Sequence, residues 1–196
     1  MTLAARLRAA VLPGTPSGLR GDWDFNDDEL GRQRSLKEAA VLVGIVDRPR
    51  PTLLLTRRLD TLRSHAGQVA FPGGRIDPED AGPVEAALRE AHEEVALPPS
   101  AVEVLGITDA YETGSGYRIT PVIGILPPDL PLVPAADEVA SLFEVPLDFV
   151  LDPANQKLHE AEWQGLRRRY YAIDWETHHI WGATAGMIVN LSRRLA

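Results

Sequence analysis

The chain has 196 residues, 44% apolar and 24% charged, which is typical of a globular domain with a real core. Its formal net charge of −8 argues against general nucleic-acid binding and means that an anionic substrate needs a local basic patch. The chain has no cysteine, and its longest apolar runs are far shorter than the ~18 residues of a membrane span. We therefore expect a single-domain cytoplasmic protein that binds neither nucleic acid nor membrane.

The first 35 residues carry the weakest pattern. A short helix is expected from Leu3 to Val11, followed by a Pro/Gly loop and an acidic patch from Asp22 to Glu29. The start of the chain lacks the sustained apolar core of a signal peptide. We interpret residues 1–35 as an N-terminal arm packed on the domain, which would occupy residues 36–196.

Two apolar segments follow this arm. The segment from Lys37 to Asp47 contains AAVLVGIV, and its length and valine content indicate a buried strand. After the turn Pro49-Arg50-Pro51, a second strand is expected from Thr52 to Arg58. The two strands together predict a hairpin.

A Phe-Pro-Gly-Gly turn at Phe71 to Gly74 precedes a predicted helix, roughly Pro83 to Val95. The apolar residues of this helix recur at helical spacing along one face, namely Val84, Ala87, Leu88, Ala91 and Val95. Its three acids are expected on a separate stripe nearly opposite the apolar face, and these are Glu90, Glu93 and Glu94.

Carboxylates one helical turn apart repel one another, and water weakens this repulsion. One interpretation of the stripe is therefore an acidic helix face exposed to solvent. The alternative is a cation site, because Mg²⁺ and Mn²⁺ prefer oxygen ligands. The glycine-rich turn just upstream would let the backbone approach a metal ion or a phosphate closely. The turn and the helix together favour a metal–phosphate site.

The remaining segments alternate between strands and helices. Strands are expected from Val102 to Tyr111, Tyr117 to Leu126, Arg168 to Trp175 and His178 to Trp181, with a strand pattern also in SLFEVPL. Helices are expected at Leu147 to Leu151 and Gly182 to Leu195. The strands around a central and a terminal helix predict an α/β/α sandwich with a mixed sheet.

The loop and the helix resemble the signature of the Nudix hydrolases, G-x5-E-x7-R-E-U-x-E-E-x-G-U, in which U is apolar. Gly74 matches the first glycine, and the run Arg89–Glu94 matches R-E-U-x-E-E. There are three departures: Asp80 stands where Glu is usual, eight residues separate it from Arg89, and Ala96 replaces the last glycine. The extra residue falls before the helix, so the register of the acids is intact.

The residues from Leu54 to Gly74 read L-L-x-x-R-x3-L-R-x-H-x-G-x3-F-P-G-G. This pattern resembles the extra signature of the coenzyme A pyrophosphatase branch of the Nudix family. Arg58 and Arg63 can form charge-assisted hydrogen bonds to phosphate oxygens. His65 can donate one to a phosphate or a ribose, although a structural role is an equal alternative.

The resemblance implies the Nudix fold and hydrolysis of the pyrophosphate bond of coenzyme A or an acyl derivative. The products would be 4′-phosphopantetheine, or its acylated form, and adenosine 3′,5′-bisphosphate. Two alternatives stay open: another Nudix activity, on ADP-ribose, a dinucleoside polyphosphate or a nucleoside triphosphate, and a non-catalytic nucleotide-binding module. The sequence is compatible with a homodimer but does not determine the oligomeric state.

The resemblance also implies roles for the acids of the helix. Mg²⁺ or Mn²⁺ would be held by Glu90 and Glu94, with Glu93 as a further ligand. Arg89 would hold a glutamate in place by an ion pair. The Gly73-Gly74 turn would contribute to substrate or metal binding through its backbone.

The proton acceptor is the least determined part of the site. Glu138, in the segment beyond the main helix, resembles the acid that acts as base or extra metal ligand in many Nudix hydrolases, and a helix glutamate such as Glu93 is the other candidate. An exposed surface acid is an equal interpretation of Glu138. Glu144, within SLFEVPL, is a less favoured candidate.

Overall fold

The computed structural model describes residues 2–11, 20–24, 26, 35–62, 65–163 and 166–196. The strands of the main sheet are β1 (Lys37–Val46), β2 (Thr52–Arg58), β3 (Val69–Ala70), β4 (Gly73–Arg75), β5 (Glu103–Ile107), β6 (Tyr111–Glu112), β7 (Tyr117–Leu126) and β8 (Val139–Pro146). A second sheet contains β9 (Lys157–Trp163), β10 (Leu166–Trp175) and β11 (His178–Trp181). The helices are α1 (Leu3–Arg8), α2 (Pro83–Val95), α3 (Leu147–Leu151) and α4 (Ala183–Leu195), with short 3₁₀ turns η1 (Asp22–Asp24), η2 (Pro99–Ala101) and η3 (Pro153–Asn155).

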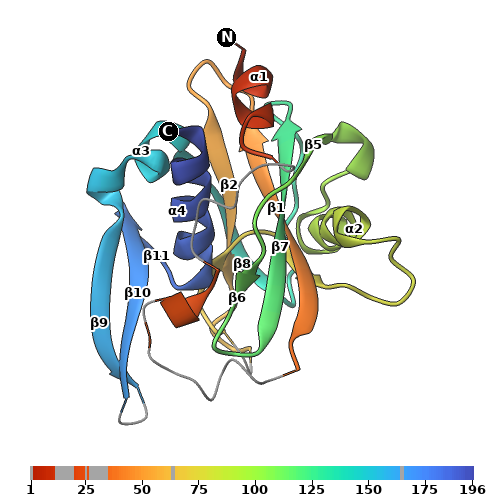
Figure 1. Ribbon diagram of the computed structural model, residues 1–196. Helices are drawn as coiled ribbons and strands as arrows, with labels where there is room; N and C mark the ends of the chain where they lie inside the picture. The colour runs from red at the N-terminus through yellow and green to blue at the C-terminus, as the bar shows by residue number, and fades with distance from the viewer. Residues whose placement is uncertain (1, 12–19, 25, 27–34, 63–64, 164–165) are drawn as a thin grey trace.

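Helices cover both faces of the main sheet, so the predicted α/β/α sandwich is confirmed. Helix α2 lies on one face, and α4 lies on the other between the main sheet and the smaller sheet (Figure 1). Within the described part of the chain, no helix is long and apolar enough to cross a membrane.

The centre of the main sheet is the parallel pair of β1 and β7, in register from Lys37 opposite Tyr117 to Val46 opposite Leu126. Because helices cover both faces, β1 is apolar on both sides and shows no alternation of polar residues. Its side chains alternate between two cores. Val41, Val43 and Ile45 face the α4 side, and Ala40, Leu42 and Val46 face the α2 side.

The predicted hairpin of β1 and β2 is much shorter than expected. These strands pair only at Ile45–Leu53 and Val46–Thr52, because the same edge of β2 then pairs with β3, while β8 occupies the opposite edge of β2. The gap beside the first half of β1 is filled by β4. The predicted Phe-Pro-Gly-Gly turn therefore ends in a short strand, and both glycines lie inside the sheet.

The described N-terminal residues contact the body of the fold. Leu7 and Ala10 are fully buried in the core on the α4 side. The Asp22 carboxylate accepts hydrogen bonds from the Tyr111 hydroxyl at 2.9 Å and from the Gly114 N–H at 2.7 Å. A domain boundary after residue 35 stays a prediction.

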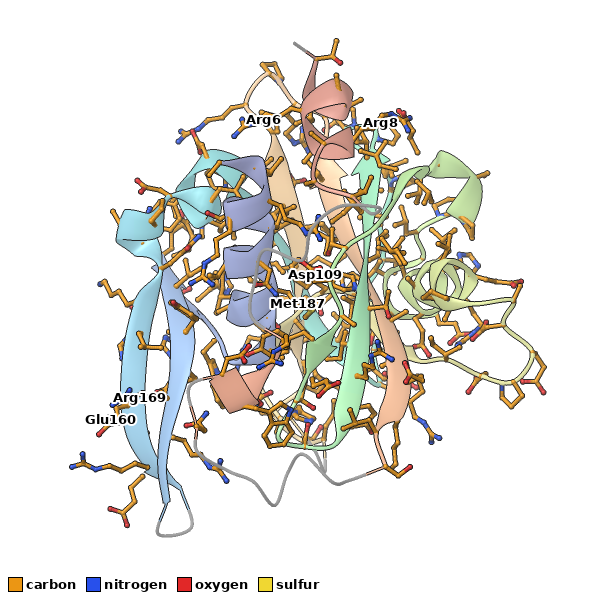
Figure 2. All side chains as sticks on the ribbon, in the orientation of Figure 1. Arg6, Arg8, Asp109, Glu160, Arg169 and Met187 are labelled. Atoms are coloured by element: carbon orange, nitrogen blue, oxygen red, sulfur yellow. The ribbon has the colours of Figure 1, made fainter. Side chains whose placement is uncertain are left out.

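The two last predicted strands are present as β10 and β11 and pair as an antiparallel hairpin, but β9, which pairs with the other edge of β10, was not predicted. Its sequence KLHEAEW mixes polar and apolar residues without the β-branched content that marks a strand. Glu160 and Arg169 face each other on β9 and β10 (Figure 2), with 3.2 Å between carboxylate and guanidinium. Arg167, whose side chain is exposed, pairs with the same glutamate at 3.2 Å.

Candidate active site

Helix α2 has the predicted bounds, but its acids do not form one exposed stripe. Glu94 follows Ala87 by seven residues, close to two helical turns, so both side chains point toward the sheet. Glu94 is only 5% exposed, Glu90 is partly buried, and the side chain of Glu93 is 57% exposed. The expectation that all three lie nearly opposite the apolar face was wrong, because Glu90 and Glu94 flank the buried face.

The Glu94 carboxylate lies between the backbone of β4 and the end of β2. One oxygen accepts the Gly73 N–H at 3.2 Å, and the other lies 3.5 Å from a guanidinium nitrogen of Arg58. Burial raises the pKa of Glu94, the Gly73 N–H and Arg58 lower it, and the charges of Glu90 and Glu138 raise it, which together bring the pKa to about 7. A cation beside this carboxylate would favour its ionised form.

The Glu90 carboxylate packs directly on the backbone of Gly74. A Cβ atom at Gly74 would lie 2.5 Å from the Glu90 carboxyl carbon, and one at Gly73 would lie 2.4 Å from the Ala40 carbonyl oxygen. Neither position therefore has room for a side chain. Burial raises the pKa of Glu90, an effect that Arg89 opposes and that the charges of Glu93 and Glu138 reinforce.

Arg89 links the loop before α2 to the acids on the helix. Its guanidinium makes a bidentate pair with Asp80 at 2.9 and 3.0 Å, and it donates to Glu90 at 3.0 Å and to Glu93 at 3.2 Å. A further bond reaches the Arg75 carbonyl at 3.0 Å. Asp80, the departure from the Nudix signature, thus lies where a carboxylate can orient Arg89. The ion pairs of Arg89 with Glu90 and Glu93 are present, and the role of Arg89 in positioning these acids stays a prediction.

The loop contributes one contact that the sequence did not indicate. Asp77 lies 3.5 Å from the Arg89 guanidinium. Its backbone N–H also donates to Asp80 at 2.8 Å. The acidic composition of the loop was visible in the sequence, but a turn that brings two of its acids to one arginine was not.

Two of the candidate bases, Glu138 and Glu144, lie toward opposite ends of β8. Glu138 is exposed just before the strand, and its carbonyl accepts the Leu59 N–H at 3.0 Å. Its charge affects the pKa of both buried helix glutamates, so it lies on the side of the site. On the neighbouring strand β2, the partners of Val139 and Glu144 are Arg58 and Leu54, four residues or roughly 13 Å apart, so Glu144 lies well away from the site. It is held by the hydroxyl of Thr52 and by Arg48, at 2.9 and 3.0 Å, so it belongs to a structural ion pair.

Of the basic residues in the coenzyme A-type segment, the structure places Arg58 at the site. Its Nε is buried and has no hydrogen-bond partner among the described residues. His65 is exposed, with Nδ1 2.9 Å from the Gln68 side-chain oxygen. Arg63 lies outside the described residues.

The chemistry of the donor set fits a hard divalent cation. Carboxylate oxygens are the ligands that Mg²⁺ and Mn²⁺ prefer, and burial of Glu90 and Glu94 creates a cost that a cation would offset. As they stand, no three acidic or histidine side chains in the described ranges converge closely enough to hold a metal ion. Arg58 and Arg89 occupy these carboxylates instead. Metal binding would therefore require the acids to exchange arginine contacts for the cation.

Comparison with known proteins agrees with this geometry. A family model described as the NUDIX domain matches residues 36–172. The chain belongs to the Nudix family. Nudix hydrolases generally use divalent metal ions such as Mg²⁺ or Mn²⁺.

Individual Nudix relatives support the same assignment. The chain is 48% identical over 159 residues to the uncharacterized Nudix hydrolase NudL of Escherichia coli, covering 81% of this chain and 83% of the relative. Its counterpart in Shigella boydii is 49% identical over the same coverage. A MutT/nudix family protein from Enterococcus faecalis is 15% identical with a TM-score of 0.50, over 85% of this chain and 64% of the other, which shows the fold alone.

Proposed function

We propose that this Nudix protein hydrolyses the pyrophosphate bond of coenzyme A or its acyl derivatives with Mg²⁺ or Mn²⁺. The products are 4′-phosphopantetheine, or its acylated form, and adenosine 3′,5′-bisphosphate. One observation carries the proposal: Arg58, from the coenzyme A-type segment, lies 3.5 Å from Glu94 of the Nudix helix. The residues of the two signatures thus meet at one point.

Arg58 is suited to bind one of the phosphates. Its side chain is 25% exposed, and its buried Nε–H has no partner among the described residues. A phosphate oxygen would satisfy this donor and form a charge-assisted hydrogen bond. The contact of Arg58 with Glu94 is long, at 3.5 Å, so little is lost when the guanidinium turns to the substrate.

Glu90 and Glu94 would hold the divalent cation, with Glu93 as a further ligand. Such a cation neutralises pyrophosphate charge and lowers the pKa of a bound water. Arg89 keeps Glu90 and Glu93 in place, and the Asp80 carboxylate keeps Arg89 in place. The backbone of Gly74 supports Glu90 from the sheet side.

In the proposed reaction, the water oxygen forms a bond to one phosphorus while the bond from that phosphorus to the bridging oxygen breaks. The bridging oxygen leaves on the other phosphate, and the water proton passes to a carboxylate. Glu138 is the proposed acceptor, since it is exposed on the side of the site and is not held by an arginine in the described structure. Glu93 is the other candidate.

A substrate panel separates this proposal from its rivals. With Mn²⁺ present, kcat/KM should be higher for coenzyme A than for ADP-ribose or dGTP. Arg58→Ala should lower kcat/KM for coenzyme A by about 10–100-fold, the value of a charge-assisted hydrogen bond. Arg57→Ala is the matched control, because the neighbouring Arg57 pairs with Asp60 at 2.8 Å instead.

Three results would overturn the proposal. A preference for ADP-ribose or dGTP would indicate another Nudix activity. Equal losses in the two arginine variants would remove the assignment of Arg58. Absence of turnover on every compound, with binding retained, would indicate a nucleotide-binding module.

A further inference from the structure

The smaller sheet carries a cluster of histidine and aromatic side chains far from the acids of α2 in the fold (Figure 1). His159 on β9 pairs in register with Tyr170 on β10, and Asp174 on β10 pairs with His179 on β11. Because side chains alternate along a strand, these four share one face with Trp181. The other face of β10 and β11 packs into the core through Ile173 and Ile180, so the histidine face lies outward.

The two histidine rings of this face are close neighbours. The ring centroids of His159 and His179 lie 6.3 Å apart with nearly perpendicular planes. Tyr170 lies 5.8 Å from His159, and Trp181 lies 5.5 Å from Tyr170 and 6.5 Å from His179. The aromatic rings therefore form a wall around the pair.

In both histidines the Nε2 atom is left available for a ligand. The Nδ1 atom of His179 lies 2.6 Å from an Asp174 oxygen, which favours the proton on Nδ1 and leaves a lone pair on Nε2. The Nε2 atom of His159 is buried and has no hydrogen-bond partner among the described residues. A buried polar atom without a partner costs stability, so its retention here calls for a ligand.

We propose that His159 and His179 form a binding site for a borderline-soft transition-metal ion such as Zn²⁺. Imidazole nitrogens suit Zn²⁺ and Cu²⁺ but not Mg²⁺, so this site is chemically distinct from the carboxylates of α2. A carboxylate that accepts the second N–H of a metal-bound histidine is a common supporting contact, and Asp174 provides it for His179. Water completes the coordination, since Asp174 is already engaged.

The separation of the rings is compatible with a shared ion. Two imidazoles bound to one ion at ~2.0–2.1 Å have centroids on the order of 5–6 Å apart. The observed separation of 6.3 Å is close to that range. The pKa of Asp174 is lowered, chiefly by its hydrogen bond to His179, so its carboxylate is ionised and able to orient the ring at neutral pH.

Calorimetric titration with Zn²⁺ tests the proposal when millimolar Mg²⁺ is present to occupy the carboxylates of α2. The wild-type protein should bind one equivalent. His179→Ala and His159→Phe, which keeps a ring against Tyr170, should each weaken binding by about tenfold or more, and Asp174→Asn should weaken it by about tenfold. His178→Ala is the matched control, because the adjacent His178 stacks on Phe143 instead, 3.6 Å away, and this variant should bind as wild type.

Electron paramagnetic resonance with Cu²⁺ gives a second measurement that does not depend on affinity. The wild type should show coupling to two imidazole nitrogens, and His159→Phe should show one. Absence of Zn²⁺ binding by the wild type, wild-type binding by His159→Phe or His179→Ala, or an equal loss in His178→Ala would each overturn the proposal. None of these results affects the proposed hydrolase function, which rests on other residues.

Discussion

Glu94 is an ionisable side chain on the inward side of a helix, and its environment follows from that position. Its burial raises its pKa to about 7, and only the Gly73 N–H and Arg58 favour its charged form. The grouping of Glu90, Glu93 and Glu94 on one helix could be predicted from their spacing. The burial of Glu94 could not. That burial depends on the gap between β1 and β2, which is filled by β4 and is a long-range feature.

Neutralising either buried glutamate should remove the proposed metal site without unfolding the protein. Glu94→Gln and Glu90→Gln should each lower kcat by about two orders of magnitude or more, because an amide is a neutral and weaker ligand. The circular dichroism spectrum should stay that of the wild type. Glu79→Gln, at an exposed position in the loop before α2, is the control and should keep full activity.

Wild-type turnover in Glu90→Gln or Glu94→Gln would remove the metal assignment.

The assignment of Arg89 has a separate basis, since its pairs with Asp80 and Glu90 are present in the structure. Most of this network could be expected from the Nudix signature. The buried, bidentate form of the Asp80 contact could not, because the signature departs from its usual length there.

Glu144 should contribute a measurable pH dependence to stability. Its hydrogen bonds to Arg48, supported by one from Thr52, hold its pKa below the ordinary value of 4.5. Since the folded-state pKa is the lower one, ionised Glu144 stabilises the fold above about pH 4.5, and this contribution is lost as the pH falls further. Glu144→Gln should lower the free energy of unfolding at neutral pH by about 1 kcal/mol.

Urea unfolding across the pH range checks this prediction. The loss of stability between neutral pH and about pH 3 should be smaller in Glu144→Gln than in the wild type. Arg48 has a second partner, Asp129, whose side chain is 82% exposed. Asp129→Asn should therefore change the pH profile of stability little. Identical pH profiles for the wild type and Glu144→Gln would show that the ion pair does not stabilise the fold.

Local sequence determines the elements of this protein better than it determines their partners. The bounds of β2, α2 and β7 match the prediction residue for residue, because each is a continuous periodic segment between turn residues. The hairpin of β1 and β2 was overestimated because the facing edges of these two strands also pair with β4 and β3, which lie farther along the chain. Strand β9 was missed because its residues show no strand pattern.

The C-terminal end of α2 offers a stabilising substitution. Ala96 adopts a left-handed conformation, with φ 54° and ψ 30°, at the position where the Nudix signature has glycine. A side chain at such a position is strained, and glycine is not. Ala96→Gly should therefore raise the free energy of unfolding by about 0.5–1 kcal/mol.

The control for this prediction is Ala154→Gly in η3, where the backbone does not adopt a positive φ. That change should give no gain and a small loss, because glycine adds freedom to the unfolded chain. Thermal or urea unfolding of both variants is sufficient. A loss of stability in Ala96→Gly would show that the left-handed conformation is not retained in solution.

At the scale of the molecule, the net charge is −8 and acids gather at the site. Binding of a cation there should therefore stabilise the whole folded protein. If Mn²⁺ binds the folded state as proposed, saturating Mn²⁺ should raise the melting temperature by about 5 °C or more, as expected for ~2–3 kcal/mol of linked binding. Glu90→Gln should lose most of this shift. Activity should vanish in EDTA and return with Mg²⁺ or Mn²⁺, and persistence in the chelator would indicate a metal-free mechanism.

The overall architecture and the family could be predicted from one chain because the Nudix signature combines a loop, a helix and fixed acids. The substrate is less accessible to such reasoning. Specificity depends on how a flexible ligand contacts residues from several segments. The proposed contacts include Arg58 and His65, whose separation in space is set by loops and not by periodicity. The cluster around His159 was also invisible, because its members come from three strands.

The most direct test of the proposed reaction is product analysis after incubation with coenzyme A and Mn²⁺ in ¹⁸O-enriched water. The proposal predicts equal amounts of 4′-phosphopantetheine and adenosine 3′,5′-bisphosphate. One ¹⁸O atom should be incorporated into either the 4′-phosphate of the first product or the 5′-phosphate of the second, and not into both. Intact coenzyme A, under conditions in which ADP-ribose or dGTP is cleaved, would contradict it.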